Sequence, residues 1–494
     1  MFQHKHPLYA ERLPDWTLMG HVFAGERAVK EQSDLYLPPT SAMRANGYNH
    51  LTRASNYTPG GAAYEAYKMR AVFHDFVRDA VSGLLGIMHR QAPIVEVPER
   101  LAPMVESFSV AGEPLDLVWR RVSQAQLVDG RIGMLVDVPT GLSVADTVPY
   151  VALYGAGTIT NWDVTARDAG RYALQLVVLD ESGNVRQPTM EWLHVKRYRV
   201  LAQSDIASAM SGQDLPEGAY VVGVAESESE IPAFFAPQVG SEMLSAIPFV
   251  FVNSNDLAPE PDLPPLLGLA NLSLAIYRGE ADYRQALYLQ GQDTLVRVGY
   301  VPPLGEDGSS PVQVGAGSVI DLPIGGTASF IGVSATGLGE QRAALENDKA
   351  QASQKAVQLL DTSRGGAESG EALRVRVSAR TASLASLQQT AAQAFRDCLR
   401  YAGAWMGLPD SELDKIRVEP NLDFSDARVD TASVNALMDA VGKGAPLSME
   451  SIHKWLAENE YTDLPFLEEL EKMGARPVSV SGVPEGEAPS DDAP

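Results

Sequence analysis

The chain has 494 residues, and its 39 Lys and Arg against 63 Asp and Glu give a formal net charge of −24. Its 45% hydrophobic content excludes a disordered chain, and the length predicts about three domains at ~150 residues each. A single cysteine excludes a disulfide framework and a Cys-based zinc site. The acidic balance excludes a protein that coats DNA, because tight non-specific binding needs many Lys and Arg contacts to phosphates. A protein that DNA passes without sticking is not excluded.

The charge is distributed unevenly. Residues 341–400 carry nine Lys and Arg against six acids, a local +3, whereas residues 401–494 carry nineteen acids against seven Lys and Arg, a local −12. Most acidic runs of this kind are solvated surfaces. The start of the chain lacks the apolar segment of a signal peptide, and the most apolar windows are too short to cross a bilayer. We therefore expect a soluble protein used inside a cell.

The N-terminal region predicts helices. A short helical stretch is expected around Trp16–Lys30, and a turn at Thr58–Gly61 precedes a stripe of apolar residues that recur at three- and four-residue steps from Tyr64 to Met88. This stripe predicts one long helix, which ends before Pro93 because the residue preceding proline avoids the helical region.

Residues 94–255 predict a mixture of helices and strands. The strand candidates are β-rich runs bounded by Gly, Asp and Pro: Gly133–Asp137, Tyr150–Tyr154, Arg171–Asp180, Met190–Leu201, Tyr220–Val224 and Ile247–Val252.

The second half of the chain predicts three long helices, at Pro265–Tyr288, Glu340–Leu360 and Glu371–Met406. A Gly/Pro-rich stretch with strand candidates Thr294–Val298 and Ser318–Leu322 separates the first two. At ~1.5 Å per residue the third is roughly 50 Å long. A small helical unit should follow, with Asp430 and Ser448 as helix caps, and the composition from Arg476 onward predicts a disordered tail.

The sequence carries no motif for catalysis or for a cofactor. No P-loop is present, Gly332–Gly337 only approximates a nucleophile elbow, and Gly155–Gly157 lacks the third glycine of a dinucleotide fingerprint. His4 and His6 have no nearby third ligand, and Cys398 on an apolar helix face predicts a buried inert thiol. We therefore expect a non-enzyme without catalytic residues, cofactor or metal.

Basic residues gather around a Gly/Ser loop, residues 361–370. Ordinary helix-surface charge is one interpretation. The other is a flexible loop and its shoulders facing a polyanion, where a few cations per subunit guide phosphates and the acidic remainder prevents retention. The candidate DNA-facing residues are Lys349, Lys355, Arg364, Arg374 and Arg376.

Ordered motifs along the chain resemble those of a known family. The first is Tyr64-x-x-Tyr67-x-x-Arg70-Ala71-x-Phe73, followed by Gly83-x-x-Gly86-x-x-x-Arg90-x-x-Pro93. The second is Gly130-Arg-Ile-Gly133-Met-Leu-Val-Asp137, followed by Asn161-Trp162, and the last is Ser369-Gly370, followed by Asn421-Leu-Asp-Phe424. Between these lies the third, Ile247-Pro-Phe-Val, followed by Pro264-Pro265-Leu-Leu-Gly-Leu-Ala-Asn271, Tyr277 and Ala281-Asp282-Tyr283. Over roughly residues 14–460 the sequence resembles the portal proteins of tailed bacteriophages, in particular the group with the DUF4055 domain.

The resemblance implies an α+β portal fold with wing, stem, clip and crown, long helices, and a ring of twelve subunits through which DNA enters and leaves the capsid. It implies the following assignments: wing 1–255, stem helix 256–288, clip 289–339, second stem helix 340–360, tunnel loop 361–370, long wing helix with the following strand segment 371–429, crown 430–475, and disordered acidic tail 476–494.

The implied partners are other copies of the chain, double-stranded DNA without sequence specificity, the terminase large subunit, head-tail adaptor or neck proteins, and the major capsid and scaffolding proteins, with no membrane. The implied location is the portal vertex of the virion, after synthesis in the bacterial host cytoplasm. One alternative is a soluble multi-domain cytoplasmic enzyme of the hydrolase type, whose converging polar residues no motif reveals. Another is a capsid scaffold or adaptor, which would typically be smaller and simpler in composition.

Overall fold

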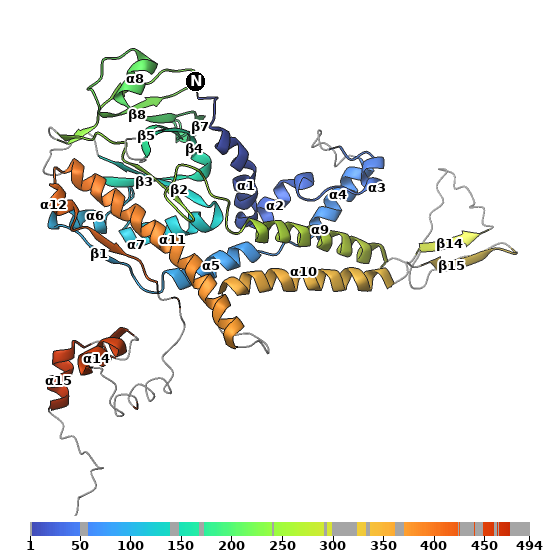
Figure 1. The fold of residues 1–494 in the computed structure, drawn as a ribbon. Coiled ribbons are helices and arrows are strands. Elements are labelled where there is room, and N and C mark those ends of the chain that lie inside the picture. Colours follow the sequence, from blue (N-terminus) through green and yellow to red (C-terminus); the bar gives the residue numbers. More distant parts are fainter. Residues whose placement is uncertain are drawn as a thin grey trace, which may run out of the picture. The chain divides into compact units, whose positions relative to one another are not determined.

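The computed structural model describes residues 2–49, 58–138, 148–166, 172–239, 242–290, 294–298, 324–331, 336–360, 370–422, 424, 439, 448–458, 462 and 464–474 (Figure 1). Helices and antiparallel sheets occur together in these residues, which confirms the α+β class. The chain divides into two compact units, Met1–Phe424 and Ser425–Pro494. No helix in the described part of the chain is long and apolar enough to cross a membrane.

The N-terminal part of the first unit is helical, as predicted. The helix α1 begins one residue after His6, whose Nδ1 accepts a hydrogen bond from the Leu8 amide at 3.2 Å and so caps it. The helices and 3-10 turns of this part are α1 (Pro7–Ala24), α2 (Glu26–Glu31), η1 (Ser33–Leu35), α3 (Ser41–Ala45), α4 (Pro59–Arg70) and α5 (Phe76–Met88).

The prediction of one long helix from Tyr64 to Met88 is wrong, because α4 and α5 are separate helices. The backbone leaves the helical region at Ala71, where ψ is 140°. Ala71 and Phe73 are nevertheless buried in the link between the helices. The apolar stripe therefore continues through residues that are not helical, which is why periodicity alone does not reveal the break.

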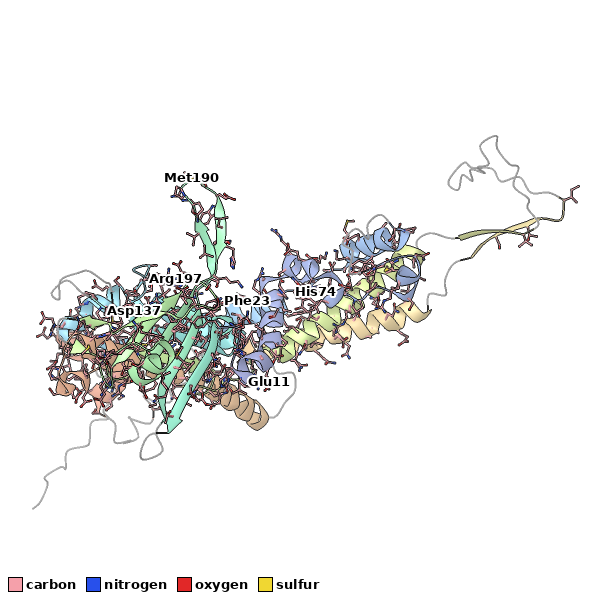
Figure 2. The ribbon with its side chains drawn as sticks, turned by 90° about the horizontal axis from the view of Figure 1, so that it is seen from above. Glu11, Phe23, His74, Asp137, Met190 and Arg197 are labelled. Carbon is pink, nitrogen blue, oxygen red and sulfur yellow. The ribbon has the colours of Figure 1, made fainter. Side chains whose placement is uncertain are left out.

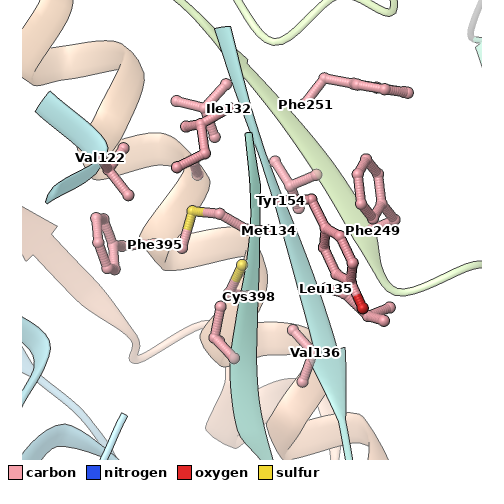
Figure 3. Packing of buried hydrophobic residues seen from close by; sticks show 14 of the residues in the cluster. Val122, Ile132, Met134, Leu135, Val136, Tyr154, Phe249, Phe251, Phe395 and Cys398 are labelled. Carbon is pink, nitrogen blue, oxygen red and sulfur yellow. The ribbon is translucent and has the colours of Figure 1, made fainter. Parts of the chain in front are cut away.

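A three-stranded antiparallel sheet of order β13-β2-β3 forms the centre of the larger hydrophobic core. Its strands are β2 (Arg131–Asp137), β3 (Tyr150–Gly155) and β13 (Phe249–Asn253). Helices α7 (Leu115–Val128) and α11 (Gly370–Trp405) pack against β2 and β13. Figure 3 shows Phe395 and Cys398 of α11 beside Met134 of β2. The central strands are thus buried and read as near-continuous apolar runs.

A five-stranded antiparallel sheet has the order β10-β9-β8-β5-β4. Its strands are β4 (Ile159–Ala166), β5 (Tyr172–Asp180), β8 (Tyr198–Gln203), β9 (Tyr220–Ala225) and β10 (Ala233–Phe235), and α8 (Ser204–Ser211) follows β8. The predicted strand Met190–Leu201 is in fact two strands, because β7 (Trp192–Val195) pairs with β6 (Gly183–Arg186) in a separate hairpin.

Short elements complete this unit: β1 (Ile94–Glu96) pairs with β16 (Arg417–Glu419), β11 (Gln238–Val239) pairs with β12 (Glu242–Met243), and η3 (Glu99–Leu101), α6 (Ala102–Glu106), η4 (Ala156–Thr158) and α12 (Asp410–Leu413) are single turns or short helices.

The three long helices of the second half are confirmed as α9 (Leu267–Gln290), α10 (Thr336–Leu360) and α11. Strand β14 (Thr294–Val298) is also confirmed, and it pairs with β15 (Thr327–Ile331). The expected strand Ser318–Leu322 and the loop 361–369 lie outside the described residues.

The second unit contains two described helices, α14 (Met449–Glu458) and α15 (Phe466–Gly474). Ser448 caps α14 as predicted, because its Oγ accepts a hydrogen bond from the Ser451 amide at 3.1 Å. Of the helix expected after Asp430 only residue 439 is described, and the tail from residue 475 onward lies outside the described residues.

Candidate functional site

Helices α9 and α10 form an antiparallel pair joined through the β14–β15 hairpin (Figure 1). The two helices approach closely at Gly279, where an added Cβ would lie 2.9 Å from Leu345 Cδ2. Leu345 and Ala352 of α10 are buried in this region. A glycine on one helix and a small side chain on the other permit a tight interface, so the pair behaves as one packed element.

A buried carboxylate ties the two helices together. Glu280 of α9 is only 3% exposed. Its carboxylate accepts a hydrogen bond from Arg284 Nε at 2.7 Å and another from Lys349 Nζ of α10. His74 Nε2 lies 3.7 Å from it. Burial alone would raise the pKa of Glu280, but the hydrogen bonds from Lys349 and Arg284 outweigh burial and lower it, so the group is charged at neutral pH.

The N-terminal helices contact the opposite half of the chain through α9. Tyr67 Oη donates a hydrogen bond to Asp282 Oδ1 at 2.5 Å, and Phe73 packs edge-on against Tyr277 with ring centroids 6.0 Å apart. Arg70 lies 4.1 Å above the ring of Tyr288. Residues of two motifs separated by about two hundred positions in the sequence therefore form one contact, and their role there is structural.

The core around the β13-β2-β3 sheet contains a buried cation that the sequence did not reveal. Arg131 is fully buried between the rings of Trp162 and Phe251, with its guanidinium carbon 4.4 Å and 4.3 Å from the ring centroids. None of its guanidinium nitrogens has a hydrogen-bond partner among the described residues. Burial lowers the pKa of Arg131 to about 9, and the charge of Glu260 only partly opposes this shift. The ring of His6 stacks on the Trp162 ring at 3.9 Å.

The sequence signal for this cation was its place at the start of a buried strand. Burying a charged residue in an otherwise apolar run costs free energy, because the charge is removed from water. Here the faces of two aromatic rings offset this cost. The aromatic partners lie on other strands, β4 and β13, so local sequence did not reveal them.

The predicted inert thiol is confirmed. Cys398 is fully buried, and burial raises its pKa well above the usual range, which keeps it protonated and unreactive. Within the described ranges no group of three or more His, Cys, Asp and Glu side chains is arranged to hold a metal ion. His89 Nε2 lies 3.0 Å from Ser123 Oγ, within hydrogen-bond distance.

The family model described as "Domain of unknown function (DUF4055)" matches residues 265–406, a range that holds α9, the β14–β15 hairpin, α10 and α11. Residues 265–406 therefore resemble a DUF4055 domain, and this range is called the DUF4055 domain below. The predicted resemblance to this domain is thereby confirmed. No curated protein matches the chain.

The solved structures that match the chain include "Virion of native gene transfer agent (GTA) particle", at 12% identity and a TM-score of 0.38, covering 77% of this chain and 89% of the other. Two further ones, "Neck of native GTA particle computed with C12 symmetry" and "Neck of empty GTA particle computed with C6 symmetry", have 12% identity and a TM-score of 0.37, covering 80% of this chain and 90% of the other. Likeness at this level establishes no shared function.

The candidate DNA-facing residues all lie in the DUF4055 domain, but the structure describes the side chains of only two of them. Lys349 is held by Glu280, and Lys355 is exposed on α10 without an ion pair to any described residue. Arg374 and Arg376 lie on α11, but their side chains are outside the described part, as is all of Arg364. Whether these residues face DNA stays a prediction.

Proposed function

We propose that this chain is the portal protein of a tailed bacteriophage. Twelve copies would form a ring at one vertex of the capsid, and the genome would pass through its channel during packaging and ejection. The observation that carries the proposal is that the DUF4055 domain consists of two antiparallel helices, a hairpin between them and one long helix. These are the segments that the sequence resemblance assigns to stem, clip, stem and wing.

The packing of the helices suits a channel wall. A stem must keep its geometry while a stiff polyanion moves past it, and the contact at Gly279 together with the buried Glu280–Lys349 pair makes α9 and α10 one unit. Helix α11 then continues into the core beside the central sheet. We propose residues 256–288 and 340–360 as the stem, 289–339 as the clip, 361–370 as the tunnel loop and 430–475 as the crown.

The charges of the chain suit passage rather than retention of DNA. A net charge of −24 per chain repels phosphates, and a few cations near the constriction can guide them. Since Lys349 is neutralised by Glu280, we expect Lys355 and Arg364 to contribute more to this guidance. No step of the proposed function is catalytic, so the motor would be a separate protein, the terminase, and adaptor, capsid and scaffolding proteins would be the other partners.

The ring is tested by light scattering on the purified chain after size exclusion. We expect a closed particle near twelve times 53.1 kDa, and electron microscopy along the axis gives the subunit number. A stable monomer or dimer with measurable hydrolytic turnover would contradict the proposal and favour the enzymatic alternative.

The channel assignment is tested in phage particles that carry Lys355→Ala with Arg364→Ala. We expect altered packaging or loss of packaged DNA. The matched control is Arg342→Ala, which removes an exposed cation of the same helix α10 that is already paired with Glu346 at 2.7 Å. If packaging and DNA retention are unchanged in the double variant, the assignment of these residues to the channel is wrong. The proposal of a ring does not depend on that result.

A further inference from the structure

The hairpin of strands β6 and β7 exposes apolar side chains to solvent. Trp192 is 64% exposed, Met190 68%, Val185 50% and Leu193 45%. Figure 2 shows the hairpin extending away from the body of the fold, with Met190 at its tip. A two-stranded hairpin is at best marginally stable in water. Large exposed apolar residues on such an element are typical of a contact surface.

The register of the hairpin sorts these residues onto two faces. Val185 lies opposite Leu193, and Arg186 lies opposite Trp192. Since directly opposed residues of an antiparallel pair point to the same side, one face is aliphatic and the other combines an aromatic ring with a cation. Trp and Arg are the residue types most enriched where protein surfaces bind each other.

A groove of about 370 Å³ lies elsewhere in the same unit. Most of its lining residues are of apolar type, but polar atoms make up more than half of its exposed surface. Its walls include Leu174 of β5, Phe251 of β13, Leu257 and Tyr401, with one carboxylate, Asp397. Leu174 and Leu257 are only partly buried, so the groove is open to a partner. Asp397 is partly buried, and this burial raises the pKa of its carboxylate.

The hairpin and the groove lie at opposite ends of the same strand. β5 contributes Ala173 and Leu174 to the groove at one end, and after its last residue, Asp180, the chain enters the hairpin at Gly183. At ~3.3 Å per residue the two ends of β5 are roughly 25 Å apart. One copy therefore cannot place its own hairpin in its own groove, but a neighbouring copy can.

The charges of the two surfaces are complementary. Residues 183–197 contain Arg186, Lys196 and Arg197 against one acid, Glu191, but Lys196 and Arg197 are already paired with Glu228 and Glu181. Arg186 is therefore the cation that can face the groove, where Asp397 is the one charged residue among the described lining residues. In a chain with a net charge of −24, the hairpin is an element that can approach a second copy without like-charge repulsion.

We propose that the β6–β7 hairpin of one subunit binds in the groove between β5, β13 and α11 of the next subunit. This inference rests on the proposed ring and names the contact that builds it. The two surfaces differ, so the contact is head-to-tail, and such contacts close into rings when the rotation per subunit permits.

The first test compares a hairpin variant, Trp192→Ser with Leu193→Ser, with the wild type by light scattering over a range of concentrations. Contact residues of this kind are each worth about 2 kcal/mol, so we expect the concentration needed for assembly to rise at least ~30-fold. Leu35→Ser with Leu117→Ser is the matched control, because it removes two exposed leucines from helical segments outside both surfaces and should assemble normally. Far-UV circular dichroism checks that each variant is folded.

The second test uses a groove variant, Leu257→Lys, which places a cation where the basic hairpin would bind. We expect it to remain monomeric by itself, like the hairpin variant. A mixture of the two variants should form particles of two chains and stop there, because one intact hairpin and one intact groove remain and form a single contact.

The outcomes separate this inference from the proposed ring. Monomers of each variant and dimers in the mixture support the head-to-tail contact. Normal rings from either variant would overturn the contact while leaving the ring intact. A wild-type chain that stays monomeric would overturn the ring and with it this contact.

Discussion

Arg131 is a buried charge that is stacked between two aromatic rings. Its stabilisation comes from two ring faces rather than from hydrogen bonds, so shape should matter more than charge. Methionine fills a similar volume without a charge to desolvate, and Arg131→Met should lose less than about 1.5 kcal/mol of stability. Lysine keeps the charge but lacks the planar face, and Arg131→Lys should lose about 2–4 kcal/mol.

The measurement is the urea midpoint of the two full-length variants under identical conditions. The expected order of stability is wild type, then Met, then Lys. A Lys variant as stable as the wild type would show that charge rather than stacking determines this position.

Glu280 should make stability depend on pH in a defined window. Its pKa is lowered from 4.5 in the folded chain, so its contribution is fully present above pH 4.5 and is lost as the pH falls through the lowered value. Glu280→Gln leaves Lys349 without its partner, and we expect a loss of about 2 kcal/mol at pH 7 that shrinks in acid. The control Glu346→Gln breaks an exposed pair with Arg342 and should change stability by less than ~0.5 kcal/mol.

The loss of stability of both variants is measured by thermal unfolding at neutral and acidic pH. Equal losses for the two glutamines, or a loss at Glu280 that persists in acid, would contradict the buried ion pair as its source.

At the scale of elements, the contact between α9 and α10 depends on Gly279. Gly279→Val would place atoms into Leu345, and overpacking of this kind costs about 1–3 kcal/mol. Adding Leu345→Ala makes room, so the double variant should be more stable than the sum of the two single losses predicts. Gly268→Ala on the same helix meets nothing within 4 Å and should be neutral or slightly stabilising. Additive losses in the double-mutant cycle would show that the two residues do not meet.

The elements differ in how far sequence could predict them. Long helices such as α9 and α11 can be predicted from the spacing of their apolar residues, because this spacing repeats over many turns. The break between α4 and α5 was hidden because Ala71 and Phe73 bury apolar side chains from an extended link. Of the candidate site, the cations were visible in sequence, but the pairing of Lys349 with a carboxylate 69 positions away depends on helix packing that no local pattern records.

At the scale of the whole molecule, the net charge sets how copies of the chain meet. With −24 on each chain, neighbours in the proposed ring would repel one another at long range. Screening shortens the range of this repulsion from ~30 Å at 0.01 M salt to ~8 Å at 0.15 M salt. The apolar contact proposed for the hairpin is not weakened by the same change. We therefore expect rings to form at lower protein concentration as the salt concentration rises.

The location of the charge should matter more than its total in this titration. Arg186→Glu and Arg27→Glu change the net charge equally, but the first lies on the exposed hairpin and the second on α2. We expect Arg186→Glu to need clearly more salt than the wild type and Arg27→Glu only slightly more, as measured by light scattering at a series of salt concentrations. Assembly that weakens as salt is added would mean that ion pairs, and not apolar contacts working against repulsion, hold the subunits together.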